Sequence, residues 1–151
     1  MMEWPEIIEL SVSVVIAIGV VIAAYQIWHA KQQSVATFED VFTRQYREII
    51  QRIPVKALLN EELSENDFQA ALNEIYNYID LTNEQIFLRR QKRIRLKTWG
   101  NWLDGIKANL ALPAFKRSWE LIKEKTPDDF FEELRRLEIT KFEADPKSWK
   151  E

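Results

Sequence analysis

The chain has 151 residues, which suits one domain, and contains only three glycines and five prolines. Such a scarcity of turn-forming residues disfavours an all-β fold and favours helices. The absence of cysteine and the presence of a single histidine, His29, exclude disulfides, thiolate sites and most zinc, di-iron or Ser-His-Asp chemistry. The formal net charge of -3 predicts neither nucleic-acid binding nor an unusual surface. We therefore expect an all-α protein.

The first predicted element is an apolar helix near the N-terminus. Residues 10–30 contain no Asp, Glu, Lys or Arg, and a helix of that length rises about 32 Å, which matches the hydrocarbon core of a bilayer. We interpret residues 1–30 as a short outside tail followed by a transmembrane anchor. A cleaved signal peptide, which needs a basic start, and a buried core helix are the alternatives. Residues suited to the membrane interface flank the segment: Trp4, Tyr25, Trp28 and Lys31.

The charges on either side of this segment predict its orientation. Residues 1–30 include three glutamates and no Lys or Arg, whereas Lys31, Arg44, Arg47 and Arg52 follow the segment. Because basic residues stay on the cytoplasmic side, we expect the N-terminus outside and the C-terminal domain in the cytoplasm.

Small and polar residues share one face of the predicted anchor. Gly19 and Ala23 form a pair of small residues four apart, which allows two helix backbones to approach closely, and Gln26 lies on the same stripe. This face predicts self-association in the membrane. The alternative is that glycine and alanine are simply common in such helices and that Gln26 reaches interfacial water.

Residues 31–139 are predicted to form a cytosolic bundle of about four to five helices. Apolar residues recur at spacings of three and four from Val35 to Ile53, just before a proline. This pattern predicts an amphipathic helix that continues the anchor. A second helix is expected over residues 65–88, after the capping residue Ser64.

Local signals also predict where the later helices begin and end. A third helix is expected from about Trp99 to Leu110. Pro113 suits the first position of a fourth helix, because proline has no N–H to leave unpaired there. Thr126 suits the N-cap of a last helix that ends near Leu137.

A short polar tail, residues 140–151, follows the predicted bundle. Its composition predicts fraying, although Phe142 and Trp149 are side chains that can dock onto the bundle. The predicted organisation is therefore an anchor in residues 1–30, a helical bundle in residues 31–139, and this tail.

A basic segment lies between the second and third helices of the predicted bundle. It contains six cations within residues 89–97: Arg89, Arg90, Lys92, Arg93, Arg95 and Lys97. If the helix over residues 65–88 runs antiparallel to residues 31–53, it returns this segment to the bilayer surface, where each cation gains about 1 kcal/mol from anionic lipid. A solvated helix end, an acidic partner and RNA or DNA are the alternatives. Nucleic acid is disfavoured because no exposed aromatic–Gly platform accompanies the charges.

No motif in the sequence predicts a catalytic, cofactor-binding or metal site. Asp128, Asp129, Glu132 and Glu133 would place two carboxylate pairs on one helix, but they lack the Glu-x-x-His element of di-iron bundles. Their place in a first helical turn is already explained by the helix dipole. His29, at the predicted membrane boundary, is a candidate pH switch, with an interfacial polar residue as the alternative.

Two glycines and an asparagine stand out in the region of the third helix. Gly100 and Gly105 lack the preceding strand and the Lys-Ser/Thr end of a phosphate loop. We expect them instead to allow close helix packing around Trp99 and Trp102. Asn109 lies between apolar neighbours and is a candidate buried polar residue that bonds a helix end.

Three segments of the chain carry a resemblance to a known family. They are Phe42–Pro54, Tyr78–Gln85, and Trp102–Lys107 continued by Pro113–Trp119. Following a single apolar segment, they resemble an uncharacterised bacterial family, frequent in cyanobacteria, with one N-terminal span and a small cytosolic helical domain of unknown function. The resemblance implies this architecture and a bacterial inner or thylakoid membrane, and it implies no activity. The same plan is similar to membrane effectors of bacterial phage defence that assemble into pores.

We therefore predict a non-enzymatic, single-pass membrane protein whose bundle is a protein-interaction or scaffolding module. Its expected partners are the lipid bilayer, an unidentified cytosolic or membrane protein, and other copies of itself. An oligomeric, phage-defence-like effector or pore, with Gly19, Ala23 and Gln26 at its seam, is the first alternative. Binding of anionic lipid or nucleic acid through residues 89–97 is the second.

Overall fold

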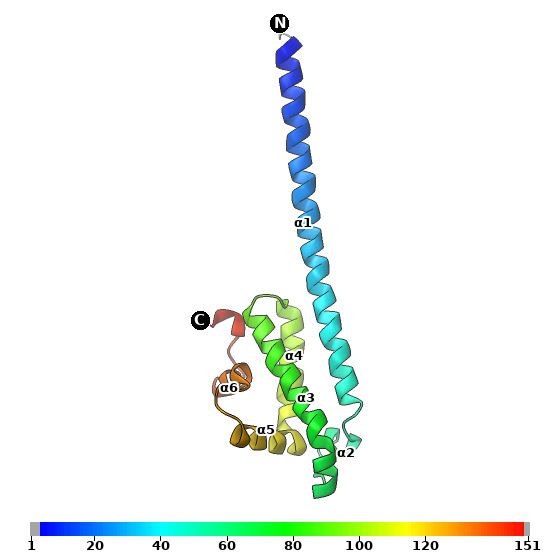
Figure 1. Cartoon of the computed structure of the whole chain (residues 1–151), viewed down its shortest axis with the longest axis vertical. Helices are drawn as coiled ribbons and strands as arrows, with labels where there is room; N and C mark the ends of the chain where they lie inside the picture. The colour runs from blue at the N-terminus through cyan, green and yellow to red at the C-terminus, as the bar shows by residue number, and fades with distance from the viewer. Residues whose placement is uncertain (1–3, 150–151) are drawn as a thin grey trace. The chain divides into compact units, whose positions relative to one another are not determined.

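The computed structural model describes the backbone of residues 4–149 and the side chains of residues 14–149. Over this range every regular element is helical, which confirms the predicted all-α class (Figure 1). The elements are α1 (Trp4–Ile50), α2 (Val55–Leu58), α3 (Glu65–Arg90), α4 (Leu96–Ala111), α5 (Pro113–Lys125), α6 (Glu132–Ile139) and the short 3-10 helix η1 (Pro146–Ser148).

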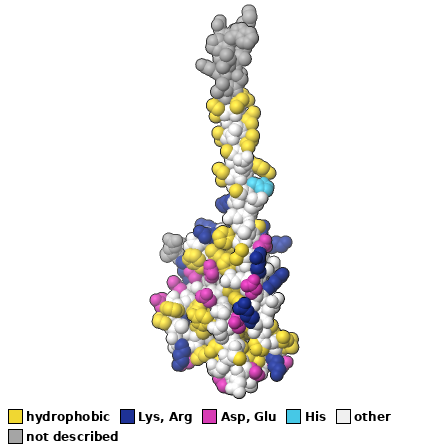
Figure 2. Space-filling view, turned by 45° about the vertical axis from the view of Figure 1, so that its right-hand side comes forward, with side chains coloured by type: hydrophobic (Ala, Val, Ile, Leu, Met, Phe, Trp, Pro, Cys, Tyr) yellow, Lys and Arg dark blue, Asp and Glu magenta, His cyan; other side chains and the backbone are white. Residues whose placement is uncertain are grey.

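The chain divides into two units, residues 1–37 and residues 38–151, and α1 contributes to both. In the first unit every described side chain up to residue 34 is exposed, including Val15 at 68% and Ile27 at 71%. Figure 2 shows apolar side chains along this unit and charges of both signs over the second. By length and composition α1 is able to cross a membrane, because its apolar window has a mean hydropathy of 1.6 and is 0% buried.

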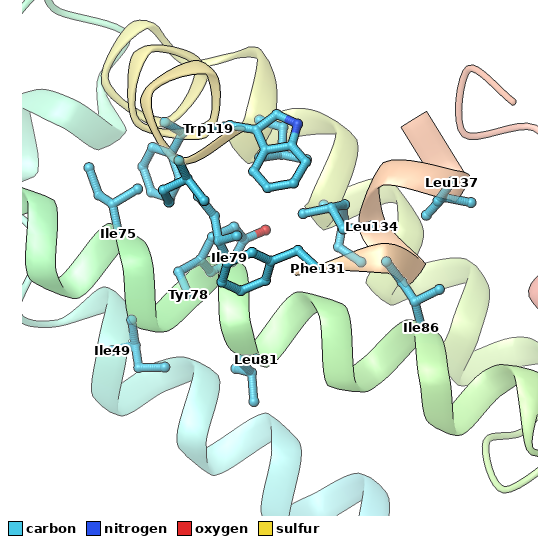
Figure 3. Packing of buried hydrophobic residues seen from close by; sticks show 14 of the residues in the cluster. Ile49, Ile75, Tyr78, Ile79, Leu81, Ile86, Trp119, Phe131, Leu134 and Leu137 are labelled. Atoms are coloured by element: carbon cyan, nitrogen blue, oxygen red, sulfur yellow. The ribbon is translucent and has the colours of Figure 1, made fainter. Parts of the chain in front are cut away.

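The second unit is built around α3. This helix packs against α5, α6 and η1, while α4 and α2 both pack against α5. Figure 3 shows Ile75 and Ile79 of α3 facing Trp119 of α5, with Leu134 of α6 close by. Ile75, Ile79 and Leu134 are fully buried, so the centre of the core lies along α3.

Capping residues account for the starts of two helices. Ser64 is the N-cap of α3, and its hydroxyl accepts a hydrogen bond of 3.2 Å from the backbone N–H of Asp67. Pro113 occupies the first turn of α5, where its missing N–H leaves nothing unpaired. The predicted starts of both helices are therefore confirmed, and α3 ends two residues beyond the predicted boundary.

The last helix begins later than the sequence predicts. Thr126 is the C-cap of α5 and not an N-cap, because its hydroxyl donates to the carbonyl of Ile122 at 2.7 Å. The chain then turns, and Phe131, in the left-handed conformation with φ 57°, precedes α6 at Glu132. Phe131 is 7% exposed and its ring meets Trp119 edge to face, so burial of this ring compensates for the strained backbone. Asp128 and Asp129 consequently lie in the turn and not on the helix.

The C-terminal tail is held against the bundle as far as Trp149, so the predicted fraying is wrong for this part. The helix η1 packs on α3, and Pro146 is buried. Phe142 and Trp149 dock as partly buried side chains against the core. The guanidinium of Arg136 lies 4.6 Å from the centre of the Trp149 ring. Apolar contacts and a cation–π contact therefore hold a segment whose composition is polar.

Candidate functional site: a cavity between α1, α3 and α4

The structure divides the predicted basic segment into buried and exposed cations. Arg89 is 4% exposed and donates from Nε and Nη2 to the two carboxylate oxygens of Asp145, at 2.8 and 2.5 Å. Its Nη1 donates to the carbonyl of Ile94 at 2.7 Å. Such burial is incompatible with a contact between Arg89 and lipid headgroups. Arg89 instead joins the end of α3 to the C-terminal tail.

Two more arginines of this segment also bind within the bundle. Arg90 pairs with Glu133 of α6 at 2.6 Å, and Arg95 pairs with the buried Glu39 of α1. Among the described residues, only three cations of the segment remain exposed and without an ion pair. They are Lys92, Arg93 and Lys97.

These contacts change the ionisation of the carboxylates involved. Hydrogen bonds from Arg89 hold the pKa of Asp145 below its usual range. Burial raises the pKa of Glu133, and Arg90 opposes that effect only in part. One carboxylate oxygen of Glu133 and the Nε of Arg90 are buried without a hydrogen bond. The pair therefore fixes α6 to α3 at the cost of two unsatisfied polar atoms.

A cavity of about 280 Å³ lies between α1, α3 and α4, within the second unit. Helical spacing brings its lining together, since positions three, four or seven apart share one face of a helix. The lining residues are Thr43, Tyr46 and Arg47 of α1, Tyr78 and Gln85 of α3, and Asn101, Trp102, Gly105 and Ile106 of α4.

Aromatic rings form much of the wall of this cavity. The rings of Tyr46 and Tyr78 meet edge to face with centroids 6.2 Å apart, and Trp102 packs against Phe42 at 5.9 Å. Burial raises the pKa of Tyr78 to about 12, so its side chain remains a neutral phenol at physiological pH. Asn109 is half-buried and donates to the Tyr46 hydroxyl at 3.5 Å, so it bonds a side chain and not a helix end as predicted.

Some polar side chains of the cavity have a hydrogen-bond partner within the described structure, and others have none. The Thr43 hydroxyl donates to the carbonyl of Glu39 at 2.9 Å. Gln85 is only 5% exposed, yet its amide makes no hydrogen bond to another described residue. Arg47 is the one charged residue of the lining; it is exposed and has no ion pair within the described part of the chain. The cavity thus offers a free amide and a free guanidinium next to aromatic surface.

Close packing of a neighbouring helix does not account for the presence of Gly100 and Gly105 in α4. A Cβ added at Gly100 or at Gly105 would meet no atom within 4 Å, so the expectation that they permit close approach of another helix is wrong. Gly105 lines the cavity, where the missing side chain leaves space.

Sequence reasoning missed this cavity. Its clearest signal is Gln85, a polar residue beside Ile86 on a helix whose buried positions are otherwise mostly apolar. A polar residue at a core position is unusual unless it has a partner.

The residues predicted for the membrane interface and for helix association lie on α1. Gly19, Ala23 and Gln26 are all exposed there. The rings of Tyr25, Trp28 and His29 come together, with centroids between 5.6 and 6.2 Å apart. Lys31 is exposed, and Trp4 lies outside the residues whose side chains are described.

The acidic residues do not form a metal centre in the described part of the chain. Over those residues no three Asp, Glu or His side chains gather in an arrangement that would hold a metal ion. Asp80 and Glu84 lie exposed on α3, and Asp128 pairs with Arg135 at 3.3 Å.

No protein-family model, no curated protein and no solved structure matches this chain. The resemblance to a bacterial family of single-span proteins therefore stays a prediction.

Proposed function

We propose that this chain is a non-enzymatic, single-pass membrane protein whose helical bundle is a protein-interaction or scaffolding module on the cytoplasmic side of a bacterial membrane. One observation carries the proposal: an apolar helix with all of its described side chains exposed up to residue 34 precedes a bundle that has its own core. Apolar surface in water costs about 25 cal/mol per Å². A bilayer removes that cost on every side of the helix at once.

The absence of cysteine allows a sharp test of the anchor and its orientation. Single cysteines are introduced as Glu3→Cys, before the apolar segment, and Lys116→Cys, at an exposed position of α5. In intact bacteria an impermeant maleimide should label Glu3→Cys, and it should label Lys116→Cys only after lysis. The opposite labelling would contradict the orientation. Release of the protein by a carbonate wash of the membranes would contradict the anchor.

The exposed part of the basic segment supports an interaction with an anionic surface. Leu96 is 69% exposed and lies next to Lys97, with Lys92 and Arg93 shortly before it. Arg95 pairs with Glu39, and only a short length of chain separates Glu39 from the end of the apolar segment at Ala30. Basic residues near an exposed apolar side chain suit anionic headgroups, each cation contributing about 1 kcal/mol.

Vesicle flotation of residues 38–151, the unit that contains the core, tests this surface. We expect binding to vesicles with anionic lipid and none to neutral vesicles. Replacing Lys92, Arg93 and Lys97 by Gln should abolish binding. Replacing Lys56, Lys116 and Lys125 by Gln changes the net charge equally, at other exposed positions, and should preserve most of it. Equal loss in both triple variants, or equal binding to neutral vesicles, would contradict the assignment.

A second candidate function, an oligomeric membrane effector or pore, rests on the exposed face of α1. Gly19 offers open space, since an added Cβ there meets no atom within 4 Å, and Ala23 and Gln26 lie on the same face. Light scattering after size exclusion in mild detergent should then give a discrete oligomer. Gly19→Leu should dissociate it, and Val21→Leu, on another face, should not. A monomeric wild-type protein would remove this candidate.

A further inference from the structure

We infer that the cavity between α1, α3 and α4 binds a small, planar organic anion that carries an amide-like edge. The volume of about 280 Å³ lies near the lower end of the range for ligand sites, so the ligand is of single-ring size. Tyr46, Tyr78 and Trp102 supply aromatic surface for the face of such a ring.

The amide of Gln85 indicates which chemical group the edge of the ligand carries. An amide carries two N–H donors and a carbonyl acceptor, so a ligand can bond it at both of its polar atoms. Gln85 is 5% exposed, lines the cavity and has no partner among the described residues. A lactam or imide edge, which presents a donor beside an acceptor, satisfies both sides of this amide together.

The guanidinium of Arg47 indicates that the ligand is negatively charged. Among the described residues that line the cavity there is no carboxylate. Arg47 has no ion pair in the described structure. A guanidinium binds a carboxylate through two parallel hydrogen bonds, so an acidic group at one end of the ring suits Arg47.

Equilibrium dialysis of the full-length protein in mild detergent, against protein-free micelles as blank, tests this inference. The probe is orotate, a planar ring with an imide edge and a carboxylate. Uracil lacks the carboxylate, and benzoate lacks the imide edge. We expect saturable binding of one orotate per chain, and at least tenfold weaker binding of uracil and of benzoate.

Matched variants connect binding to the cavity. Gly105→Leu fills the cavity and should abolish orotate binding, whereas Gly100→Leu, on the same helix but outside the lining, should preserve it. Arg47→Gln should weaken orotate binding at least tenfold without changing uracil binding, and Arg44→Gln, an exposed arginine outside the lining, should change neither. Circular dichroism confirms that each variant is folded, and Gln85→Leu replaces Gly105→Leu if the latter unfolds. No saturable orotate binding at millimolar concentration, or unchanged binding in the cavity variants, would overturn the inference.

Discussion

Apolar side chains are exposed in one stretch of α1 and buried in another. In residues 14–34, Ile18 and Ile22 are 54% and 51% exposed. In residues 38–50, Phe42 and Ile49 are 5% and 8% exposed. Both stretches are helical, so helix propensity does not separate them. The difference lies in the sequence pattern: residues 14–25 of the first stretch are apolar on all sides, whereas the second stretch alternates an apolar face with charged residues.

The two stretches of α1 require different surroundings. A helix with one apolar face is stabilised by packing that face against neighbours, as α1 does in the second unit. A helix that is apolar all round needs an apolar medium on every side. Identical residues should therefore contribute differently to the stability of the bundle, and matched substitutions measure that difference.

The largest difference is expected between two isoleucines. Ile79 of α3 is 0% exposed and lies in the core, whereas Ile18 of α1 is 54% exposed. Ile79→Ala leaves a cavity and should destabilise the bundle by about 2–5 kcal/mol. Ile18→Ala should leave its free energy of unfolding unchanged. Urea unfolding of the full chain in mild detergent, followed by tryptophan fluorescence, measures both. A similar loss in the two variants would show that the first unit contributes to the stability of the bundle.

A smaller difference is expected between two arginines that form ion pairs. Arg89 is buried and binds both Asp145 and a backbone carbonyl. Arg117 pairs with Glu65 at the surface, where the two side chains are 50% and 62% exposed. Arg89→Gln should cost about 2–3 kcal/mol, because it leaves a partly buried carboxylate without its partner. Arg117→Gln should cost about 1 kcal/mol or less, since surface pairs contribute little. Equal unfolding midpoints would contradict the assignment of Arg89 as a structural residue.

The same contact predicts a pH dependence. The pKa of Asp145 is held below its usual range by hydrogen bonds from Arg89, so the unfolded chain binds a proton here more readily than the folded chain. The stabilisation is present above the ordinary aspartate pKa of about 3.9, and it is lost as the pH falls from that value through the folded pKa. Wild-type protein and Asp145→Asn should therefore differ most near neutral pH and converge as the pH falls below about 4. If the free energies of unfolding of wild type and Asp145→Asn stayed the same distance apart down to acidic pH, the predicted pH dependence would be contradicted.

Local signals explain which helices the sequence predicts well. Ser64 and Pro113 begin α3 and α5 as expected, because a cap acts on its own first turn. By residue type Thr126 is a capping residue of the same kind as Ser64, yet α6 begins only at Glu132. There the Thr126 hydroxyl bonds the preceding helix and Phe131 is drawn into the core, so tertiary packing prevails over the local signal.

The candidate site depends on contacts that no local pattern reveals. Arg89 meets Asp145, and Glu39 meets Arg95, each across 56 positions of the sequence. A charge count of residues 89–97 cannot separate the arginines that bind within the fold from the cations left exposed. The cavity likewise requires residues of three helices together with the space at Gly105. Sequence reasoning therefore predicts the elements better than it predicts the site that they form.

The smallest difference is expected between glycines of the two units. Gly100 lies inside α4, and Gly19 lies inside α1; an added Cβ meets no atom within 4 Å at either position. Alanine in a helix interior is favoured over glycine by about 0.5–1 kcal/mol, because glycine loses more backbone freedom on folding. Gly100→Ala should therefore raise the stability of the bundle by about that amount. Gly19→Ala should leave the unfolding of the bundle unchanged, because residues 1–37 form a separate unit. Equal stabilisation by both alanines would show that the two stretches of α1 unfold together. The stretches would then differ in the exposure of their side chains and not in their contribution to stability.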